Sequence, residues 1–452
     1  MPCQIKDCQF QVPESQLISF SNLHYCIFHT LIDKKGDWGK EKKESFNKEI
    51  DEYIQLCINE GKGIDFSYVV FPTVIEFSGK KFPNISFAGA DFAGSAIFME
   101  TQFEGTINFE GVIFRDSVSF TRANFSREVS FNGAQFCQGG DFENTKFTGY
   151  ADFRSTKFEG PAFFLDANFC DLAIFSEVNF RETVNFSRVK FKNDTLFINT
   201  DFGDTTEFFK TQFEEFVDFS KIIRGDRVLG FPRMGFNGSS FGSSITFNNR
   251  SFLASTNFEK CTFIRAPNFH NCNLHQDTVF PPERFFKDTN IEGAVSAYRT
   301  LKFAMENVRA RREEGMFYAL DQKSLRNDPE VSKTAKFFSW LYEKTADYGQ
   351  SMGKPLACLG GVTGGFFVLY FAIACAYASQ TKSYWELALK TLGFSFKQAF
   401  QPFYVLRQPS LEWLTDITGI RWVKALATLE SLFILGLFAL FLLCVRWNFK
   451  RG

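Results

Sequence analysis

The chain has 452 residues and a balanced charge, with 50 Lys and Arg against 51 Asp and Glu. This balance excludes a broadly basic nucleic-acid-binding protein and a strongly acidic disordered one. Its 11 cysteines are spread over a long chain, which argues against a disulfide scaffold. One count is anomalous, because Phe occurs 62 times and Tyr only 12, and such an excess indicates a periodic cause.

The N-terminal segment, residues 1–35, carries two pairs of candidate metal ligands with the spacing C-x4-C and, after a longer interval, C-x2-H. Two close pairs separated by a longer loop suit a tetrahedral zinc ion. Four protein ligands would close the coordination shell, so the predicted role is structural and not catalytic. We therefore expect zinc to be bound by Cys3, Cys8, Cys26 and His29. The alternative is four unrelated polar residues, with His24 as a possible substitute ligand.

Residues 36–62 predict a helix. Phe46, Ile50, Tyr53 and Cys57 recur in it at helical spacing. A helix at this place would cap the start of the structure that follows.

The Phe residues from Phe66 onward define that structure. From Phe92 to Phe219 their spacing alternates between 6 and 5 residues without a break, which gives a period of 11. Steps of 5 and 6 put successive residues on opposite faces of an α-helix, so the repeat is not helical. A small or β-branched residue lies two positions before each Phe, and residues two apart on an extended segment point the same way. Short extended segments joined by tight turns describe a solenoid.

Stretches such as ANFSREVSFNGAQF and ADFRSTKFEGPAFF resemble the pentapeptide-repeat family, in its Phe-centred variant with an 11-residue double unit. The resemblance implies a mainly β fold, a right-handed quadrilateral β-helix over residues 63–282. Such a solenoid would offer its outer faces to a protein partner.

The Phe series breaks once, at SKIIRGDRVLGFPRMG. We expect two inward positions to be lost here and a loop to project near residues 220–230, because insertions in repeat proteins map to loops. The loop is basic, so Arg224, Arg227 and Arg233 are candidates for a contact site. A tolerated insertion without function is the alternative.

A second group of possible metal ligands, His270, Cys272 and His275, follows the break. Cys272 lies two residues before Leu274, in the small inward position of the repeat, as Cys261 does before Phe263. This register favours packing inside the solenoid over metal binding.

Residues 283–350 predict a cytoplasmic helical linker. Apolar residues of the stretch IEGAVSAYRTLKFAMENV form one stripe of a helix, and the opposite face is charged. This helix would either cap the last coil or pair with another chain.

Residues 351–452 predict a transmembrane module with two spans. No charged residue occurs from Pro355 to Thr381, and residues 425–445 form a second apolar segment. Each is long enough for a bilayer, which requires about 20 apolar residues. The first ten residues lack an apolar stretch of signal-peptide length, so we expect both termini to be cytoplasmic and the protein to lie in the inner or cell membrane.

Two features of the spans are candidate functional residues. The first span contains two interleaved G-x-x-x-G pairs, which allow helix backbones to approach closely, within or between chains. The second contains an ionisable residue, which inside a membrane is a functional candidate by default; a carboxylate near the outer interface is the alternative. These residues are Gly360, Gly361, Gly364, Gly365 and Glu430.

In layout, residues 351–452 resemble the two-span pore modules of tetrameric cation channels. The order is a span, a short helix, a loop and a second span. The potassium-filter sequence T-V-G-Y-G is absent, so the resemblance does not extend to potassium selectivity. No enzymatic motif is found, and we expect no enzyme. Three functions remain. They are a homo-oligomeric channel-like pore with a cytoplasmic sensing solenoid, a non-conducting membrane-tethered interaction scaffold, and a DNA mimic that inhibits a DNA-binding enzyme.

The DNA-mimic function is suggested by the charge of residues 91–219, which carry 21 Asp and Glu against 11 Lys and Arg. A membrane anchor does not suit such an inhibitor, and we expect no nucleic-acid partner.

Overall fold

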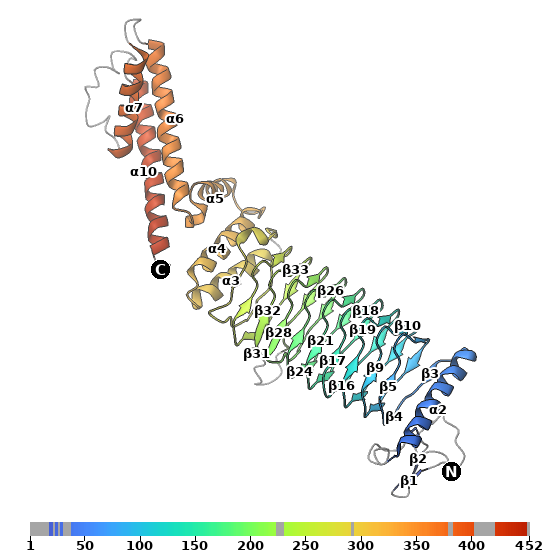
Figure 1. Ribbon diagram of the computed structural model, residues 1–452. Helices are drawn as coiled ribbons and strands as arrows, with labels where there is room; N and C mark the ends of the chain where they lie inside the picture. Colours follow the sequence, from blue (N-terminus) through green and yellow to red (C-terminus); the bar gives the residue numbers. More distant parts are fainter. Residues whose placement is uncertain are drawn as a thin grey trace. The chain divides into compact units, whose positions relative to one another are not determined.

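The computed structural model describes residues 18–20, 23–25, 28–29, 38–222, 230–290, 293–377, 383–401 and 421–449. The chain divides into two compact units. The first, here called the solenoid unit, comprises Met1–Asp288 and Glu292–Val308, and the second, the helical unit, comprises Thr289–Ile291 and Arg309–Gly452. Figure 1 shows the strands of the first and the helices of the second.

The solenoid has four faces, each built from parallel strands of two or three residues. Among the described residues, three faces hold nine strands each, and the fourth holds six strands followed by a separate pair. The repeat predicts a solenoid, and the four-sided form agrees with what the resemblance to the pentapeptide-repeat family implies. The first and last strands of the faces are β3 (Ile64–Asp65) and β34 (Ile245–Thr246), β5 (Ile75–Glu76) and β36 (Thr256–Asn257), β6 (Lys81–Phe82) and β37 (Thr262–Phe263), β4 (Val70–Phe71) and β24 (Asn179–Phe180), and, for the pair, β31 (Gly230–Phe231) and β35 (Ser251–Phe252).

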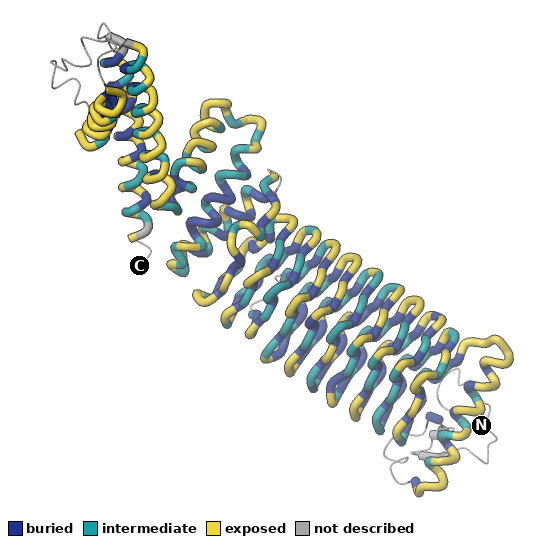
Figure 2. The backbone as a smooth tube through the Cα atoms, turned by 45° about the horizontal axis from the view of Figure 1, so that its top comes forward, coloured by how far each residue is buried: buried dark blue, intermediate teal, exposed yellow. Residues whose placement is uncertain are grey.

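The inward Phe residues form stacks that run along the solenoid. The Phe142 ring lies 5.0 Å from Phe120 and 4.9 Å from Phe164, nearly parallel to both, with interplanar angles of 8° and 2°. Rings from the opposite face meet these stacks edge-on, as Phe131 does with Phe142 at 86°. Figure 2 shows that buried positions recur in every coil. Because aromatic side chains contribute large buried areas, these stacks are the main source of the stability of the unit.

The turns explain why the period is 11 and not five. Between residues 89 and 210, a left-handed residue with φ between +54° and +68° occurs at every eleventh position. Gly occupies some of these positions, as at Gly89, Gly111 and Gly133, and polar residues such as Asn144 and Asp166 occupy others. Apart from Gly139, whose φ is 87°, only every second corner in this range uses a left-handed residue. Two turn types therefore alternate, and two pentapeptide units make one structural repeat.

A helix covers each end of the solenoid. At the N-terminal end lies α2 (Lys40–Asn59), whose buried Phe46 meets Phe71 edge-on at 6.1 Å. At the C-terminal end, Tyr298 of α3 (Ala294–Asn307) packs on Phe286 at 6.0 Å. Both helices cover coil edges that would otherwise be open to association.

The break in the Phe series is an insertion within one coil. Val184 pairs with Thr206 in the next coil, and Thr206 pairs in turn with Met234. The interval from Thr206 to Met234 is six residues longer than the interval from Val184 to Thr206, and these six residues are the insertion. The coil keeps its four faces, since Phe219 and Phe231 on either side are both fully buried. The expected loss of two inward positions is therefore wrong, because Phe231 takes the inward position that follows Phe219 and its strand β31 pairs with β35.

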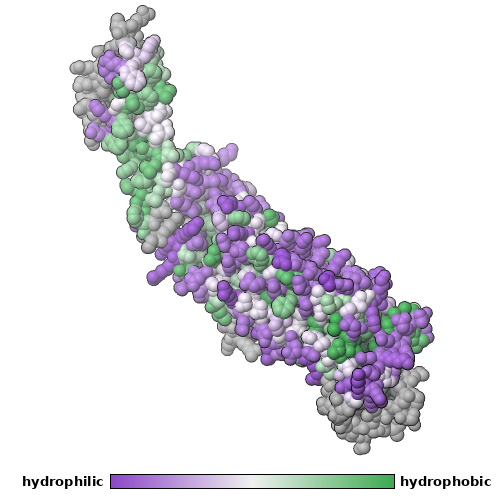
Figure 3. Space-filling view, in the orientation of Figure 1, coloured by the Kyte–Doolittle hydropathy of each residue, from purple (hydrophilic) through white to green (hydrophobic). Residues whose placement is uncertain are grey.

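The helical unit contains α4 (Arg311–Arg326), α5 (Lys333–Ala346), α6 (Gly353–Tyr377), α7 (Tyr384–Phe400) and α10 (Arg421–Phe449). Helices α6, α7 and α10 pack against one another. Two of them contain stretches long and apolar enough to cross a membrane, Gly353–Ala376 with 24 residues and Val423–Trp447 with 25. Most side chains of these stretches are not buried in the structure, and Figure 3 shows the apolar surface that results.

Candidate functional site

Glu430 lies in the middle of the packed helices of the helical unit and is fully buried. Tyr370 of α6 donates a hydrogen bond from its hydroxyl to Glu430 Oε2 at 2.9 Å. Ser395 of α7 donates to Oε1 at 2.6 Å. One carboxylate of α10 is thus held by hydroxyl groups from the two other helices. A buried carboxylate without such partners would be strongly unfavourable.

An apolar cluster and a second polar contact surround this carboxylate. Tyr370, Phe394, Val423 and Ala427 form a buried group beside it. One turn further along α7, Gln398 Oε1 accepts a hydrogen bond from Ser431 at 3.0 Å. The network therefore joins the three helices into one module and keeps Glu430 away from solvent.

The partners of Glu430 were not predicted from the sequence. Tyr370 and Ser395 precede it by 60 and 35 residues, and no motif links such distant positions. One signal was present, because Thr391, Ser395 and Gln398 share a face of α7 at helical spacing and all three are buried. A polar stripe on an amphipathic helix next to two apolar segments indicates a buried polar contact.

The four glycines of the two G-x-x-x-G pairs lie on the uncovered surface of α6. Gly360, Gly361, Gly364 and Gly365 are not buried, and a Cβ atom built on any of them would meet no atom within 4 Å. Among the described residues, then, no helix packs closely on this glycine face. Packing between chains through these residues stays a prediction.

Most of the predicted zinc site lies outside the described residues. Cys3, Cys8 and Cys26 fall there, and of the four expected ligands only His29 is described. Its ring is buried, and Nε2 lies 3.3 Å from the carbonyl oxygen of Ser67. Within the described part of the chain, no group of three or more His, Cys, Asp and Glu is arranged to hold a metal ion.

The predicted contact loop is described only in part. Arg224 and Arg227 lie outside the described residues, whereas Arg233 is exposed on strand β32 (Arg233–Gly235), whose central residue Met234 is buried. Arg233 is therefore part of a face of the solenoid and does not belong to a projecting loop.

Cys272 occupies the inward position expected from the repeat. Its thiol donates to the carbonyl of Phe247 at 3.0 Å, and burial raises its pKa to about 12. A thiol that stays protonated is a poor metal ligand. His275 Nδ1 accepts a hydrogen bond from the backbone of Asp277, so the packing interpretation of this cluster fits its geometry.

Arg250 is a buried residue that the sequence did not single out. It occupies the small inward position two residues before Phe252, where other coils have Ala, Val or Thr, and is 1% exposed. Its Nε donates to the carbonyl of Phe219 at 2.6 Å, and Nη1 donates to that of Thr200 at 3.0 Å. The guanidinium also lies 4.7 Å from the ring centre of Phe231. Burial lowers its pKa to about 10, so the group stays charged at neutral pH.

The first of these hydrogen bonds follows a rule of the solenoid. Thr156 donates to the carbonyl of Phe131 in the preceding coil at 2.8 Å, and inward threonines of other coils do the same. Arg250 makes the equivalent hydrogen bond across the insertion, from Nε to the carbonyl of Phe219. Its Nη1 donates to the carbonyl of Thr200, which lies one coil further back. Arg250 therefore ties together the coils on either side of the insertion.

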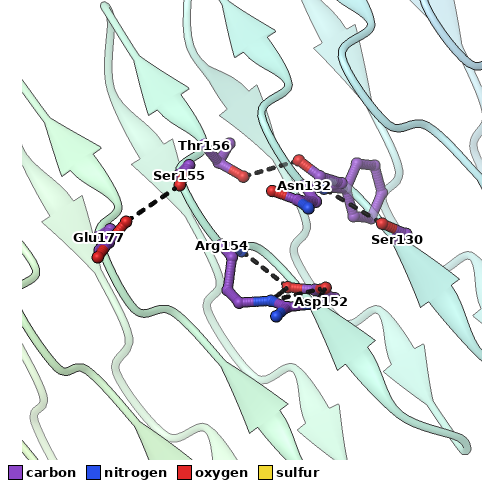
Figure 4. Close-up of polar contacts among 8 residues, drawn as sticks. Ser130, Asn132, Asp152, Arg154, Ser155, Thr156 and Glu177 are labelled. Carbon is purple, nitrogen blue, oxygen red and sulfur yellow. Dashed lines mark hydrogen bonds and ion pairs between the residues drawn. The ribbon is translucent and has the colours of Figure 1, made fainter.

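Ion pairs join neighbouring coils on the outer surface. Arg122 pairs with Glu100, Arg181 with Glu159 and Arg188 with Asp166, and in each case the carboxylate belongs to the preceding coil. Within one coil, Asp152 accepts hydrogen bonds from both the backbone and the guanidinium of Arg154 (Figure 4). The hydrogen bond from Arg188 lowers the pKa of the Asp166 carboxyl. These acidic residues are thus locally compensated.

The repeat also matches a known family. Residues 109–156 and 142–189 match the family model described as pentapeptide repeats in nine copies. Comparisons with curated proteins and with solved structures found no match. Together with the four-sided geometry, the family match identifies the solenoid as a pentapeptide-repeat domain, in a chain that also carries two helices long and apolar enough to span a membrane.

Proposed function

We propose that the protein is a membrane-tethered interaction scaffold, in which α6 and α10 cross the membrane and the solenoid is displayed on the cytoplasmic side. The observation that carries this proposal is the position of Glu430. Its two oxygens accept hydrogen bonds from Tyr370 and Ser395 of the same chain. A carboxylate satisfied in this way stabilises an anchor and is not presented to passing ions.

The uncovered sides of α6 and α10 support the anchor. Leu356 and Val368 of α6 and Leu432 and Phe438 of α10 are all exposed. Apolar side chains in this number are unfavourable in water and are accommodated by lipid.

The state of the described cysteines supports a cytoplasmic location of the solenoid. None of the eight cysteines of the described residues forms a disulfide bond, and cysteines that stay reduced suit a reducing compartment. On the side of the solenoid that Figure 3 shows, most exposed groups are hydrophilic, with scattered apolar side chains between them. Exposed apolar residues such as Tyr68, Val74, Phe163 and Leu253 are the contacts that a protein partner would use.

Fractionation and protease accessibility test this proposal. The full chain is expected to stay with membranes after alkaline carbonate extraction, and protease added to the cytoplasmic side is expected to cleave beyond the solenoid and leave α6 to α10 protected. Recovery of the intact chain in the soluble fraction would overturn the proposal. A membrane-bound chain that stays uncleaved when protease is added to the cytoplasmic side would overturn it as well.

A channel-like pore is the second candidate, favoured by the bare glycine face of α6. A second copy packed on Gly360, Gly361, Gly364 and Gly365 would bring several α7 helices together, as a pore module requires. Ion flux through the reconstituted protein separates the two proposals, since only a pore conducts.

We also propose a structural zinc ion in residues 1–35. Three thiols and one imidazole suit zinc, and a ligating histidine usually makes a hydrogen bond through its other nitrogen. His29 Nε2 at the carbonyl of Ser67 fits this arrangement. Elemental measurement of the purified protein should find one zinc per chain, and Cys3→Ser or Cys26→Ser should lose it. Metal-free protein with an ordered N-terminal segment would exclude the site.

A further inference from the structure

Helix α5 exposes a continuous group of large apolar side chains, here called the α5 aromatic face. It consists of Phe337, Phe338, Trp340 and Leu341, which are between 36% and 65% exposed. The rings of Phe338 and Trp340 each contact that of Phe337, with centroids 5.7 and 6.0 Å apart. Exposed apolar patches of this kind mark interaction surfaces.

The opposite side of α5 is held by its own unit, so the aromatic face has a defined direction. Ser339 hydrogen-bonds to the hydroxyl of Tyr348 at 3.0 Å, and Ala346 is fully buried. Glu343 pairs with Arg326 and Lys323 of α4. These contacts direct Phe337 and its neighbours away from the core of the unit.

The charges of α5 are arranged for a negative partner. Lys333, Lys336 and Lys344 lie on this helix, and its carboxylate Glu343 is engaged by the basic residues of α4. At 100° per residue, Lys333 and Lys344 lie on the same arc as Phe337, one toward each end of the helix. Aromatic residues in the middle and lysines that can extend past them are typical of a helix lying in a membrane interface.

The aromatic face is close to the proposed membrane anchor in the chain and in the fold. Residues 347–352 connect α5 to α6, and Figure 1 shows α5 beside the N-terminal end of α6, which it contacts. Met352, just before α6, and Leu356 in its first turn are also exposed. The apolar surface of the span thus continues toward α5.

We propose that α5 lies in the membrane interface, with the α5 aromatic face among the upper acyl chains and its lysines at the phosphates of anionic phospholipids. The inference rests on the proposed membrane anchor. It assigns to the chain a second lipid contact, which sets the rotation and depth of the helical unit and prefers membranes rich in anionic lipid.

Photo-crosslinking of the full chain tests this contact. Benzoylphenylalanine is placed singly at Phe338 of α5, at Phe438 of α10 or at Phe303 of α3, which are 65%, 48% and 52% exposed. The proteins are reconstituted in vesicles of equimolar phosphatidylcholine and phosphatidylglycerol, irradiated, and examined for lipid adducts by mass spectrometry. Since all three side chains are exposed, none of the replacements is expected to disturb folding.

The expected result is lipid adducts at positions 338 and 438 and none at 303, with phosphatidylglycerol enriched several-fold at 338 alone. Lys333→Gln combined with Lys344→Gln should bring the two lipids to near-equal adduct yields. Adducts at 438 without adducts at 338 would overturn the inference and leave the anchor intact. Adducts at 338 to a second copy or another protein would overturn it as well. Absence of adducts at 438 would overturn the anchor itself.

Discussion

The solenoid unit and the helical unit satisfy their buried polar groups in different ways. In the solenoid, an inward hydroxyl such as that of Thr156 donates to a backbone carbonyl one coil earlier. In the helical unit, Glu430 is held by side chains from two other helices. The first arrangement is repeated along the chain and depends on the register of the coil. The second involves a single carboxylate and depends on how three helices pack.

This difference determines how far a substitution reaches. A change at one coil affects the two coils that stack on it, and the remaining coils keep their own contacts. A change at Glu430 removes one centre that α6, α7 and α10 share. The predictions below test this contrast, beginning with the largest expected effect.

Replacing a Phe in the middle of a stack should be the most damaging change. Phe142→Ala removes a fully buried ring that contacts Phe120 and Phe164, and should lower the free energy of unfolding by about 3–5 kcal/mol. The measurement is a urea titration of the full chain in detergent, followed by circular dichroism. Phe163→Ala is the matched control, because Phe163 is 42% exposed. Equal shifts for the two variants would contradict the register of the repeat.

Loss of Arg250 should be the next largest effect. Arg250→Met keeps much of the buried volume but leaves the carbonyls of Phe219 and Thr200 without their donors, so we expect a loss of about 2–3 kcal/mol. Thr156→Val removes a single donor from an uninterrupted coil and should cost about 1 kcal/mol. The same titration compares the two. If Arg250→Met were as stable as Thr156→Val, the coils beside the insertion would not depend on the hydrogen bonds of Arg250.

These two residues mark how much of the fold the sequence could predict. The Phe stack follows from a spacing that repeats without a break from Phe92 to Phe219, so Phe142 could be assigned an inward position without a structure. Arg250 could not, because its role depends on which coils stack on either side of the insertion. The hydrogen-bond partners of Glu430 could not be predicted for a related reason. Length and apolarity identify a candidate span but do not give the rotation of one helix against another.

Removing one donor from the polar centre should have a moderate effect. Tyr370→Phe takes one hydrogen bond from the buried Glu430 carboxylate and should destabilise the helical unit by about 1–2 kcal/mol. Thermal unfolding in detergent measures it. Tyr384→Phe on α7 is the control, because Tyr384 is 74% exposed. Glu430→Met removes the acceptor, so in that background the Tyr370→Phe and Tyr384→Phe variants should be equally stable. Independent effects of Tyr370→Phe and Glu430→Met would argue against the contact.

Enlarging the glycine face should leave the fold of a single chain almost unchanged. A Cβ atom at Gly361 meets no atom within 4 Å, so Gly361→Leu should not shift the thermal unfolding midpoint. If copies pack on this face, the variant should reduce the mass of the assembly in light scattering, because Leu holds two helices apart. Gly393→Leu on α7, where the space is equally open, is the control. An unchanged assembly with Gly361→Leu would exclude this face as the contact between copies.

Ion flux through the reconstituted full chain tests the central claim, that the helical unit anchors the solenoid and does not conduct. The flux of vesicles carrying the wild-type protein, the Glu430→Gln variant or no protein is compared, with the mass of the assembly measured on the same samples. Because Tyr370 and Ser395 hold the carboxylate within the chain, we predict that all three preparations leak equally. Cation flux above that of empty vesicles, changed by Glu430→Gln at an unchanged assembly mass, would contradict the account and establish a pore.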